Sequence, residues 1–274
     1  MGIAEMAPGA GSFTFPDPAA GRRRSTRVFY QRPHREDPVT KVVLAMHGLD
    51  RAAAEFRDVL AARAQQHGTL VLVPEFDIEA FPDVHAYNYG NVRQGRDGAF
   101  RSREDWTFGI IDRLIAHVRA NLGGERTSVG MLGNSAGSQF VLRYLALNEA
   151  AFVDRAIASN SGLYMLPDLA LAYPDGMGGV GLDRAALARY FARSLTILLG
   201  EADCDGAATD LPRGPAASAQ GPHRLARGLW HFDHCKRIAE YLGVPFAWKL
   251  RVMPGAGHVD QRIYDGAMDL LAET

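Results

Sequence analysis

Residues 133–137 hold the most reactive arrangement of side chains in the sequence. They read G-N-S-A-G, the pattern G-x-S-x-G, directly after a short apolar run at 128–132 and directly before a helical pattern that opens at Ser138. A strand-to-helix turn this tight forces its central residue into a strained backbone conformation, and the two glycines keep the approach free of Cβ atoms. We therefore expect the hydroxyl of Ser135 to stand exposed at the edge of a sheet as a nucleophile.

Two further residue types are needed before a serine hydroxyl becomes a nucleophile at neutral pH. A neutral imidazole must take its proton, and a carboxylate on the other ring nitrogen must hold the tautomer and stabilise the imidazolium. We expect His258, in the loop PGAGH after the last apolar run, to be the base, and His223 is the alternative. Asp203 and Asp205, in the run GEADCD after the apolar stretch SLTILL, are the candidate carboxylates.

Apolar runs alternate with helical patterns along most of the chain, and this alternation positions those loops. The predicted strands are 41–46, 69–73, 128–132, 155–159, 194–199 and 246–253, and the predicted helices are 52–66, 102–122, 138–147, 184–193, 224–242 and 263–272. The alternation predicts an α/β protein with a doubly wound, mostly parallel sheet flanked by helices. In such sheets functional residues collect on loops at the carboxyl ends of the strands.

The chain is predicted to form a single domain over residues 1–274. Short alternating runs at 11–15 and 25–30 predict an antiparallel N-terminal edge. Segment 75–101 has no helical period and is dense in aromatic side chains, and an irregular segment of this length is usually functional. The predicted parts of the domain are N-terminal edge strands within 1–39 and two inserted loops over the active site, 160–181 and 201–222.

The G-x-S-x-G turn and the order Ser135, Asp203, His258 along the chain resemble the α/β-hydrolase family of serine hydrolases. The resemblance covers about residues 40–274. It implies the α/β-hydrolase fold, a nucleophile elbow, a Ser-His-Asp catalytic triad and a backbone oxyanion hole. In its general layout the chain also resembles, more loosely, bacterial polyhydroxybutyrate-depolymerase and feruloyl-esterase-like hydrolases.

The resemblance implies roles for individual residues. The family often takes its acid from a G-x-x-D pattern just past a strand, and residues 200–203 fit this pattern, which favours Asp203 over Asp205. Asp205 is then expected to brace the loop or to support the acid. The oxyanion hole is implied to consist of the backbone N–H groups of Ala136, directly after the nucleophile, and of Leu49, in the loop HGLD.

The pocket walls are predicted from the same layout, with ordinary loop packing as the alternative. The aromatic stretch AYNYGNV and the insertion at 160–181 lie where the family builds its acyl or alcohol pocket. For His47 a structural role, bracing the loop before Leu49, is preferred to a catalytic one. The possible pocket residues are His47, Tyr87, Tyr89, Asn91, Tyr164 and His223.

The resulting hypothesis is an esterase: a serine hydrolase without a cofactor that cleaves a carboxylic ester through an acyl-enzyme intermediate. A peptidase or thioesterase would use the same triad, and a catalytically silent binding protein of this fold is the alternative from another class. His231 and His234 are spaced as two metal ligands on one helix, but no further ligand is clearly supplied nearby, so no metal site is predicted.

The net charge and the hydropathy of the chain limit which classes of partner are expected. The formal charge is −1, with 30 basic and 31 acidic residues, so neither nucleic acid nor an anionic membrane is expected as a partner. The run at 21–24, GRRR, is expected to be a solvated turn. No apolar run reaches the roughly 18 residues of a membrane span. The expected substrate is a small-molecule or polymeric ester, and the sequence predicts neither its identity nor the oligomeric state.

The compartment is inferred from the N-terminus and the cysteines. No basic segment followed by an apolar segment opens the sequence, so a cytoplasmic location is expected. Two cysteines cannot form a disulfide framework, and they fit a reducing compartment. Contact between Cys204 and Cys235 is left open, with two separate thiols as the preferred alternative.

Overall fold

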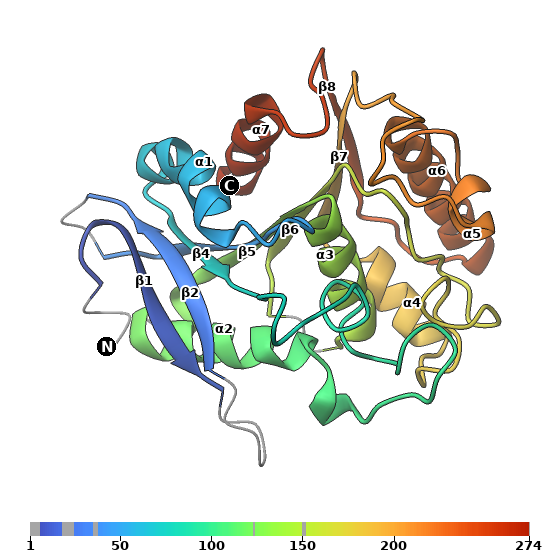
Figure 1. Cartoon of the computed structure of the whole chain (residues 1–274), viewed down its shortest axis with the longest axis horizontal. Helices are drawn as coiled ribbons and strands as arrows, with labels where there is room; N and C mark the ends of the chain where they lie inside the picture. The colour runs from blue at the N-terminus through green and yellow to red at the C-terminus, as the bar shows by residue number, and fades with distance from the viewer. Residues whose placement is uncertain (1–5, 18–24, 35–37, 123, 150–151, 274) are drawn as a thin grey trace.

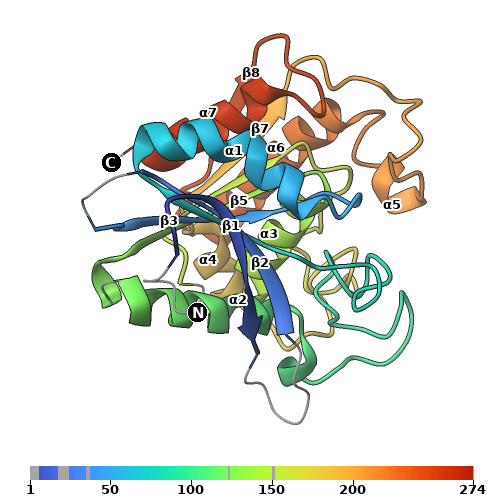
Figure 2. The ribbon, with the colours of Figure 1, turned by 60° about the vertical axis from the view of Figure 1, so that its left-hand side comes forward.

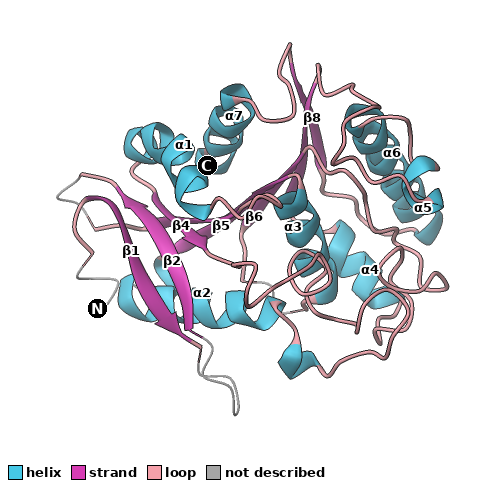
Figure 3. Ribbon diagram, viewed as in Figure 1, coloured by secondary structure: helices cyan, strands magenta, loops and turns pink. Residues whose placement is uncertain are grey.

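An eight-stranded, mostly parallel sheet runs through the molecule in the order β1-β2-β4-β3-β5-β6-β7-β8 (Figure 1, Figure 3). The computed structural model describes residues 6–17, 25–34, 38–122, 124–149 and 152–273. The strands are β1 Gly9–Pro16, β2 Ser25–Arg32, β3 Lys41–Met46, β4 Leu70–Pro74, β5 Ser128–Asn134, β6 Arg155–Ser159, β7 Leu195–Gly200 and β8 Lys249–Met253. Strand β2 pairs antiparallel with β1 and β4, and the six strands β3 to β8 are parallel to one another. The predicted fold class and its antiparallel N-terminal edge are confirmed.

Helices cover both faces of this sheet (Figure 2). The helices are α1 Ala53–His67, α2 Phe108–Leu122, α3 Ala136–Leu147, α4 Arg184–Phe191, α5 Pro215–Ser218, α6 Arg224–Leu242 and α7 Gln261–Ala272, with single 3-10 turns η2 Arg103–Asp105 and η3 Gly124–Arg126. Helices α1 and α7 pack against each other over one face, and α2, α3, α4 and α6 contribute to the core on the other. Two apolar cores, one on each face, hold the layers together.

Strands β3 and β7 lie inside the sheet and have mainly apolar side chains on both faces, whereas β8, which leads to His258, is an edge strand. Strand β3 is buried from Val42 onward, and every residue of β7 is buried. Strands of this kind are stable only where helices cover both faces of the sheet. Since β3, β5, β7 and β8 run in the same direction, the loops that follow them open at one edge, and these loops carry the predicted reactive residues.

Three helix ends carry residue types that are typical of helix caps. Helices α1 and α6 end at Gly68 and Gly243, whose φ angles of 62° and 66° lie in the left-handed region that glycine adopts without strain. Helix α4 begins where the carboxylate of Asp183 accepts a hydrogen bond from the backbone N–H of Ala186.

The helix predicted from residue 102 begins later than expected. The hydroxyl of Ser102 hydrogen-bonds the side chains of Glu104 and Asp105 at 3.2 Å and makes no capping bond to the backbone. A 3-10 turn therefore precedes helix α2, and Trp106 lies in an extended conformation between them.

The last strand is shorter than the predicted 246–253. The backbone N–H of Ala247 donates to the carbonyl of Phe191 at 2.9 Å, and the indole of Trp248 donates to that of Tyr190 at 3.1 Å. Both bonds tie the segment to helix α4, so pairing with β7 begins only at Lys249.

Two observations concern partners. None of the helices in the described part of the chain is long and apolar enough to cross a membrane. The arginine-rich run at 21–24 lies outside the described residues.

Candidate active site

Ser135 lies at the turn between β5 and α3 in a conformation that residues with a side chain rarely adopt. Its φ and ψ are 56° and −116°. A Cβ at Gly133 would lie 2.2 Å from the carbonyl oxygen of Gly137, and a Cβ at Gly137 would lie 1.8 Å from that of Met46. The turn therefore packs backbone against backbone at the end of β3, and this packing maintains the strain at Ser135.

Ser135, His258 and Asp203 are joined by two hydrogen bonds. The Nε2 atom of His258 lies 3.1 Å from the Oγ of Ser135, and its Nδ1 lies 2.8 Å from Oδ2 of Asp203. Because a carboxylate can only accept, Nδ1–H donates to Asp203, and the neutral ring accepts from the serine hydroxyl at Nε2. The three loops after β5, β7 and β8 thus meet in the arrangement that activates a serine.

The rival residues are placed elsewhere. Oδ1 of Asp205 accepts from the backbone N–H of Ala207 at 2.7 Å, and its side chain is exposed. His223 is the N-cap of helix α6, where its Nδ1 accepts from the N–H of Ala226 at 3.2 Å. Both residues have local roles in their loops.

The loop of His258 is anchored by two asparagines that the sequence reasoning missed. Asn160 donates from Nδ2 to the carbonyl of His258 at 3.1 Å, and its Oδ1 accepts from the N–H of Gly200 at 2.9 Å. Asn134 also donates to the carbonyl of His258, at 3.3 Å. Asn160 has a φ of 50° directly after strand β6. An asparagine at that position was the available signal, because asparagine tolerates the left-handed region and can bridge backbone groups.

A second missed pair lies behind the acid. The buried guanidinium of Arg224 is 3.8 Å from Oδ1 of Asp203 and 2.8 Å from Oδ1 of Asp210. The other oxygen of Asp210 is 4.0 Å from Nε2 of His258. Burial raises the pKa of Asp210, but the hydrogen bond and charge of Arg224 outweigh it, so that its pKa is lowered from the ordinary value.

The residues implied for the oxyanion hole flank the serine. Ala136 is the first residue of helix α3, whose leading N–H groups have no partner within the helix. Leu49 lines the cavity beside Ser135. His47 lies buried below this loop, and its Nε2 accepts from the N–H of Phe76 at 3.1 Å. Its other nitrogen then donates to the carbonyl of Gly48 at 2.9 Å, so His47 braces the loop.

A cavity of about 380 Å³ opens beside Ser135 and His258, and we call it the Ser135 cavity. The loop after β3, the first turns of α1 and the start of α7 form its walls. Its lining residues are Gly48, Leu49, Asp50, Ala52, Glu55, Phe56, Val59, Asn134, Ser135, Asp210, His258, Val259 and Tyr264. The predicted pocket residues His47, Tyr87, Tyr89, Asn91, Tyr164 and His223 are not among them.

The aromatic stretch is part of the scaffold instead. Tyr87 is fully buried and its hydroxyl donates to the carbonyl of His47 at 2.7 Å. The ring of Tyr89 lies 4.2 Å below the guanidinium of Arg143. Tyr164 is also buried, and its ring stacks on His231 at 4.4 Å. These rings were predicted to be pocket walls because of their position in the chain. In the structure they pack against other side chains of the scaffold and do not line the Ser135 cavity.

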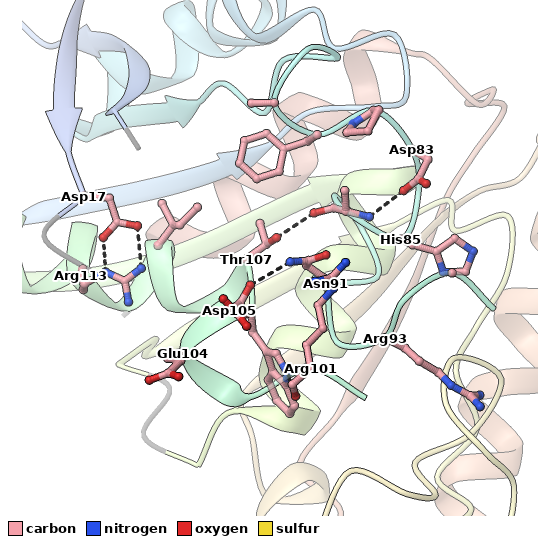
Figure 4. Close-up of a pocket in the computed structure, with 17 residues that line it drawn as sticks. Asp17, Asp83, His85, Asn91, Arg93, Arg101, Glu104, Asp105, Thr107 and Arg113 are labelled. Carbon is pink, nitrogen blue, oxygen red and sulfur yellow. Dashed lines mark hydrogen bonds and ion pairs between the residues drawn. The ribbon is translucent and has the colours of Figure 1, made fainter. Parts of the chain in front are cut away.

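Asn91 lines a different cavity of about 290 Å³, which we call the loop cavity (Figure 4). Polar side chains from segment 80–107 and the start of α2 surround it. Asn91, with a φ of 54°, donates from Nδ2 to the carbonyl of Asp105 at 2.9 Å. Arg113 is held in an ion pair with Asp17. The irregular segment therefore builds a cavity of its own.

The metal and cysteine expectations involve helix α6. Over the ranges that the structure describes, no group of three or more His, Cys, Asp or Glu side chains could hold a metal ion. His231 is buried, and burial lowers its pKa to about 3. Cys204 is exposed, Cys235 is buried, and both are free.

Comparison with solved structures gives two close matches along nearly the whole chain. Poly(aspartic acid) hydrolase-1 from Sphingomonas sp. KT-1 is 36% identical with a TM-score of 0.92, and the match covers 98% of this chain and 100% of that one. LpqC, a poly(3-hydroxybutyrate) depolymerase from Bordetella parapertussis, is 34% identical with a TM-score of 0.89, and the match covers 96% and 90%.

More distant similarity is limited to the fold. An S-formylglutathione hydrolase from Agrobacterium tumefaciens is 16% identical with a TM-score of 0.60, and the match covers 97% of this chain and 96% of that one. No protein-family model and no curated protein sequence matches the chain.

Proposed function

The chain belongs to the α/β-hydrolase family of serine hydrolases, and we propose that it cleaves a carboxylic ester through an acyl-enzyme intermediate. The observation that carries this proposal is the pair of hydrogen bonds, 3.1 Å and 2.8 Å long, that links Ser135 to His258 and His258 to Asp203. We further propose that the substrate is a small-molecule or polymeric ester.

In the first half of the reaction, Nε2 of His258 takes the hydroxyl proton while Oγ of Ser135 attacks the carbonyl carbon. Asp203, buried and bonded to Nδ1, stabilises the imidazolium that forms. The N–H groups of Ala136 and Leu49 are proposed to stabilise the negative oxygen of the tetrahedral intermediate. Collapse of this intermediate breaks the ester C–O bond, and His258 returns the proton to the leaving alcohol.

In the second half, water takes the place of the alcohol. His258 removes a proton from the water as it attacks the acyl carbon, and the second tetrahedral intermediate collapses with release of the acid. The Ser135 oxygen regains its proton from His258. Atoms balance as ester plus water giving acid plus alcohol.

A second candidate function is hydrolysis of poly(aspartic acid), and the 36% identity to the Sphingomonas enzyme favours it. The same serine chemistry would serve an amide or a thioester, because each presents a carbonyl carbon with a leaving group. Release of new chain ends from poly(aspartic acid), compared with ester turnover, separates the two candidates.

The test is turnover of p-nitrophenyl esters from acetate to palmitate by the wild type and by Ser135→Ala. We expect saturable hydrolysis by the wild type, with a chain-length optimum set by the Ser135 cavity. The Ser135→Ala protein should fold normally and lose on the order of a million-fold in kcat, because the triad members act as a unit. Turnover by Ser135→Ala at a tenth of the wild-type rate would contradict the proposal.

A further inference from the structure

The Ser135 cavity carries negative charge that the proposed reaction does not use. Asp50, Glu55 and Asp210 line it, and all three side chains are exposed to solvent. No lysine or arginine occurs among the described residues that line this cavity. A cavity wall with one sign of charge attracts substrate groups of the opposite sign and repels those of the same sign.

Two guanidinium groups interact with these carboxylates, but neither lines the cavity. Arg224 is buried and shared between Asp203 and Asp210, so these three side chains keep one net negative charge. Arg51 interacts electrostatically with Asp50, and it donates to the carbonyls of Phe76 and Phe81 at 3.0 Å each. With Arg51 counted against Asp50, the carboxylates of the wall still exceed these two cations in charge.

Aromatic side chains lie among the carboxylates. Phe56 and Tyr264 both line the cavity, with ring centroids 5.5 Å apart in an edge-on arrangement. Burial, together with the charges of Asp50 and Asp260, raises the pKa of Tyr264 to about 12. Tyr264 is therefore neutral, and its surroundings are negative. Aromatic rings combined with carboxylates stabilise alkylammonium groups.

We propose that the Ser135 cavity selects esters that carry a cationic alkylammonium group over esters that carry an anionic group. This inference rests on the proposed function and names the substrate class of the same site. It also counts against poly(aspartic acid) as the substrate of this chain, because a polyanion would meet Asp50, Glu55 and Asp210 at the cavity.

The first probe set places the charge on the acyl group. It consists of p-nitrophenyl 6-(trimethylammonio)hexanoate, its neutral analogue p-nitrophenyl 7,7-dimethyloctanoate, and mono-p-nitrophenyl heptanedioate as the anion. Three exposed carboxylates in high-dielectric surroundings should give a cation-to-anion ratio of kcat/KM of about ten at low ionic strength. The ratio should fall to about two or three in about 0.5 M NaCl, where the Debye length is only a few ångströms.

The second set places the charge on the alcohol, with choline hexanoate compared with 3,3-dimethylbutyl hexanoate by titration of the released acid. A salt-sensitive preference for the cation in either set supports the proposal and identifies which half of the ester fills the cavity. Equal kcat/KM values within both sets, or a preference for the anion, would overturn it.

Variants of the carboxylates that line the Ser135 cavity test whether these side chains cause the preference for cationic esters. The double variant Asp50→Asn/Glu55→Gln should lower the preference for the cation by about threefold, since it removes two of the three charges. Asp58→Asn is the matched control, because Asp58 is on the same helix as Glu55 but is paired with Arg57 at 2.7 Å and does not line the cavity. Equal effects of the double variant and of Asp58→Asn would contradict the proposal.

Failure of this inference is distinguishable from failure of the proposed function. If the neutral ester is hydrolysed and Ser135→Ala abolishes the hydrolysis, but charge has no effect, only the selectivity is wrong. If none of the probe esters is hydrolysed, or if Ser135→Ala retains activity, the proposed function itself fails.

Discussion

The Ser135 cavity and the loop cavity each contain a strained residue beside polar side chains, but those side chains bond different partners. Each has a non-glycine residue with positive φ, 56° at Ser135 and 54° at Asn91, next to charged and polar side chains. Around Asn91 the side chains of Asn91 and Thr107 donate to backbone carbonyls. Arg93 donates to the carbonyls of Gly98, Tyr173 and Asp97, and Arg113 is paired with Asp17. Around Ser135 the side chains bond one another in a chain that ends at a hydroxyl facing a cavity.

Strain and polar composition therefore do not identify a reactive site by themselves. Hydrogen bonds to backbone carbonyls fix a loop and leave no group free to react. A chain of bonds from a buried carboxylate through an imidazole to a hydroxyl transfers a proton. The site is therefore distinguished from the scaffold by the partners of its side-chain hydrogen bonds, which form a continuous chain from Asp203 through His258 to Ser135.

After Ser135→Ala, the largest expected effect comes from altering the acid end of the chain of bonds. Asp203→Asn should lower kcat by about ten-thousand-fold, because an amide holds the imidazole in the wrong tautomer. Asp205→Asn should lose far less, since Asp205 bonds only the backbone of its own loop. Steady-state kinetics on one ester measures both, and a reversed order of severity in folded proteins would show that the acid is misassigned.

The next effect concerns His47, which braces the loop beside the Ser135 cavity by its bonds to Gly48 and Phe76. Burial lowers the pKa of His47 from 6.5 to about 4. The unfolded chain therefore binds a proton more readily than the folded one between these values. The associated stability is fully present above about pH 6.5, and about 3 kcal/mol of it is lost as the pH falls to about 4.

Denaturant unfolding from about pH 7.5 to pH 4 measures this loss. His47→Gln keeps an acceptor for the N–H of Phe76 but does not titrate, so its unfolding free energy should fall less steeply over that range. Buried His231, with its pKa lowered to about 3, contributes a loss of the same sign and remains in both proteins. Identical pH slopes for the wild type and His47→Gln would rule out this account of His47.

The smallest effect uses a matched pair, Asn160→Gly and Asn91→Gly. Both asparagines have positive φ and donate to a backbone carbonyl, and glycine retains that conformation without strain. Asn160→Gly frees the loop of His258 and should lower kcat by about tenfold with little change in KM, because misplacement of the base affects the chemical step. Asn91→Gly should leave kcat unchanged. Equal kcat losses in the two variants would remove the distinction between the regions.

The sheet and most helices could be predicted from the sequence because their signals are local. Buried strands appear as apolar runs, and glycines at 68 and 243 mark helix ends. Ser135, His258 and Asp203 could be proposed because each follows a predicted strand. The helix start predicted at Ser102 was wrong, because the hydroxyl of Ser102 bonds the side chains of Glu104 and Asp105 and does not cap the backbone.

The pocket walls could not be predicted because they depend on how segments pack across the sheet edge. Tyr87 and Tyr164 are aromatic in the expected loops, yet their rings are buried against His47 and His231. Phe56 and Tyr264, which do line the cavity, belong to helices α1 and α7 and look like ordinary core residues in sequence. Arg224 and Asp210 are close only through the fold of the 201–222 segment.

Ser135, and no other serine, is expected to be an activated nucleophile. Treatment of the folded protein with a fluorophosphonate probe, followed by peptide mass spectrometry, tests it directly. We expect stoichiometric labelling of the peptide that contains Ser135 in the wild type, and no labelling of the Ser135→Ala protein. A folded wild-type protein that stays unlabelled, or a label on another serine such as Ser138 or Ser161, would contradict it.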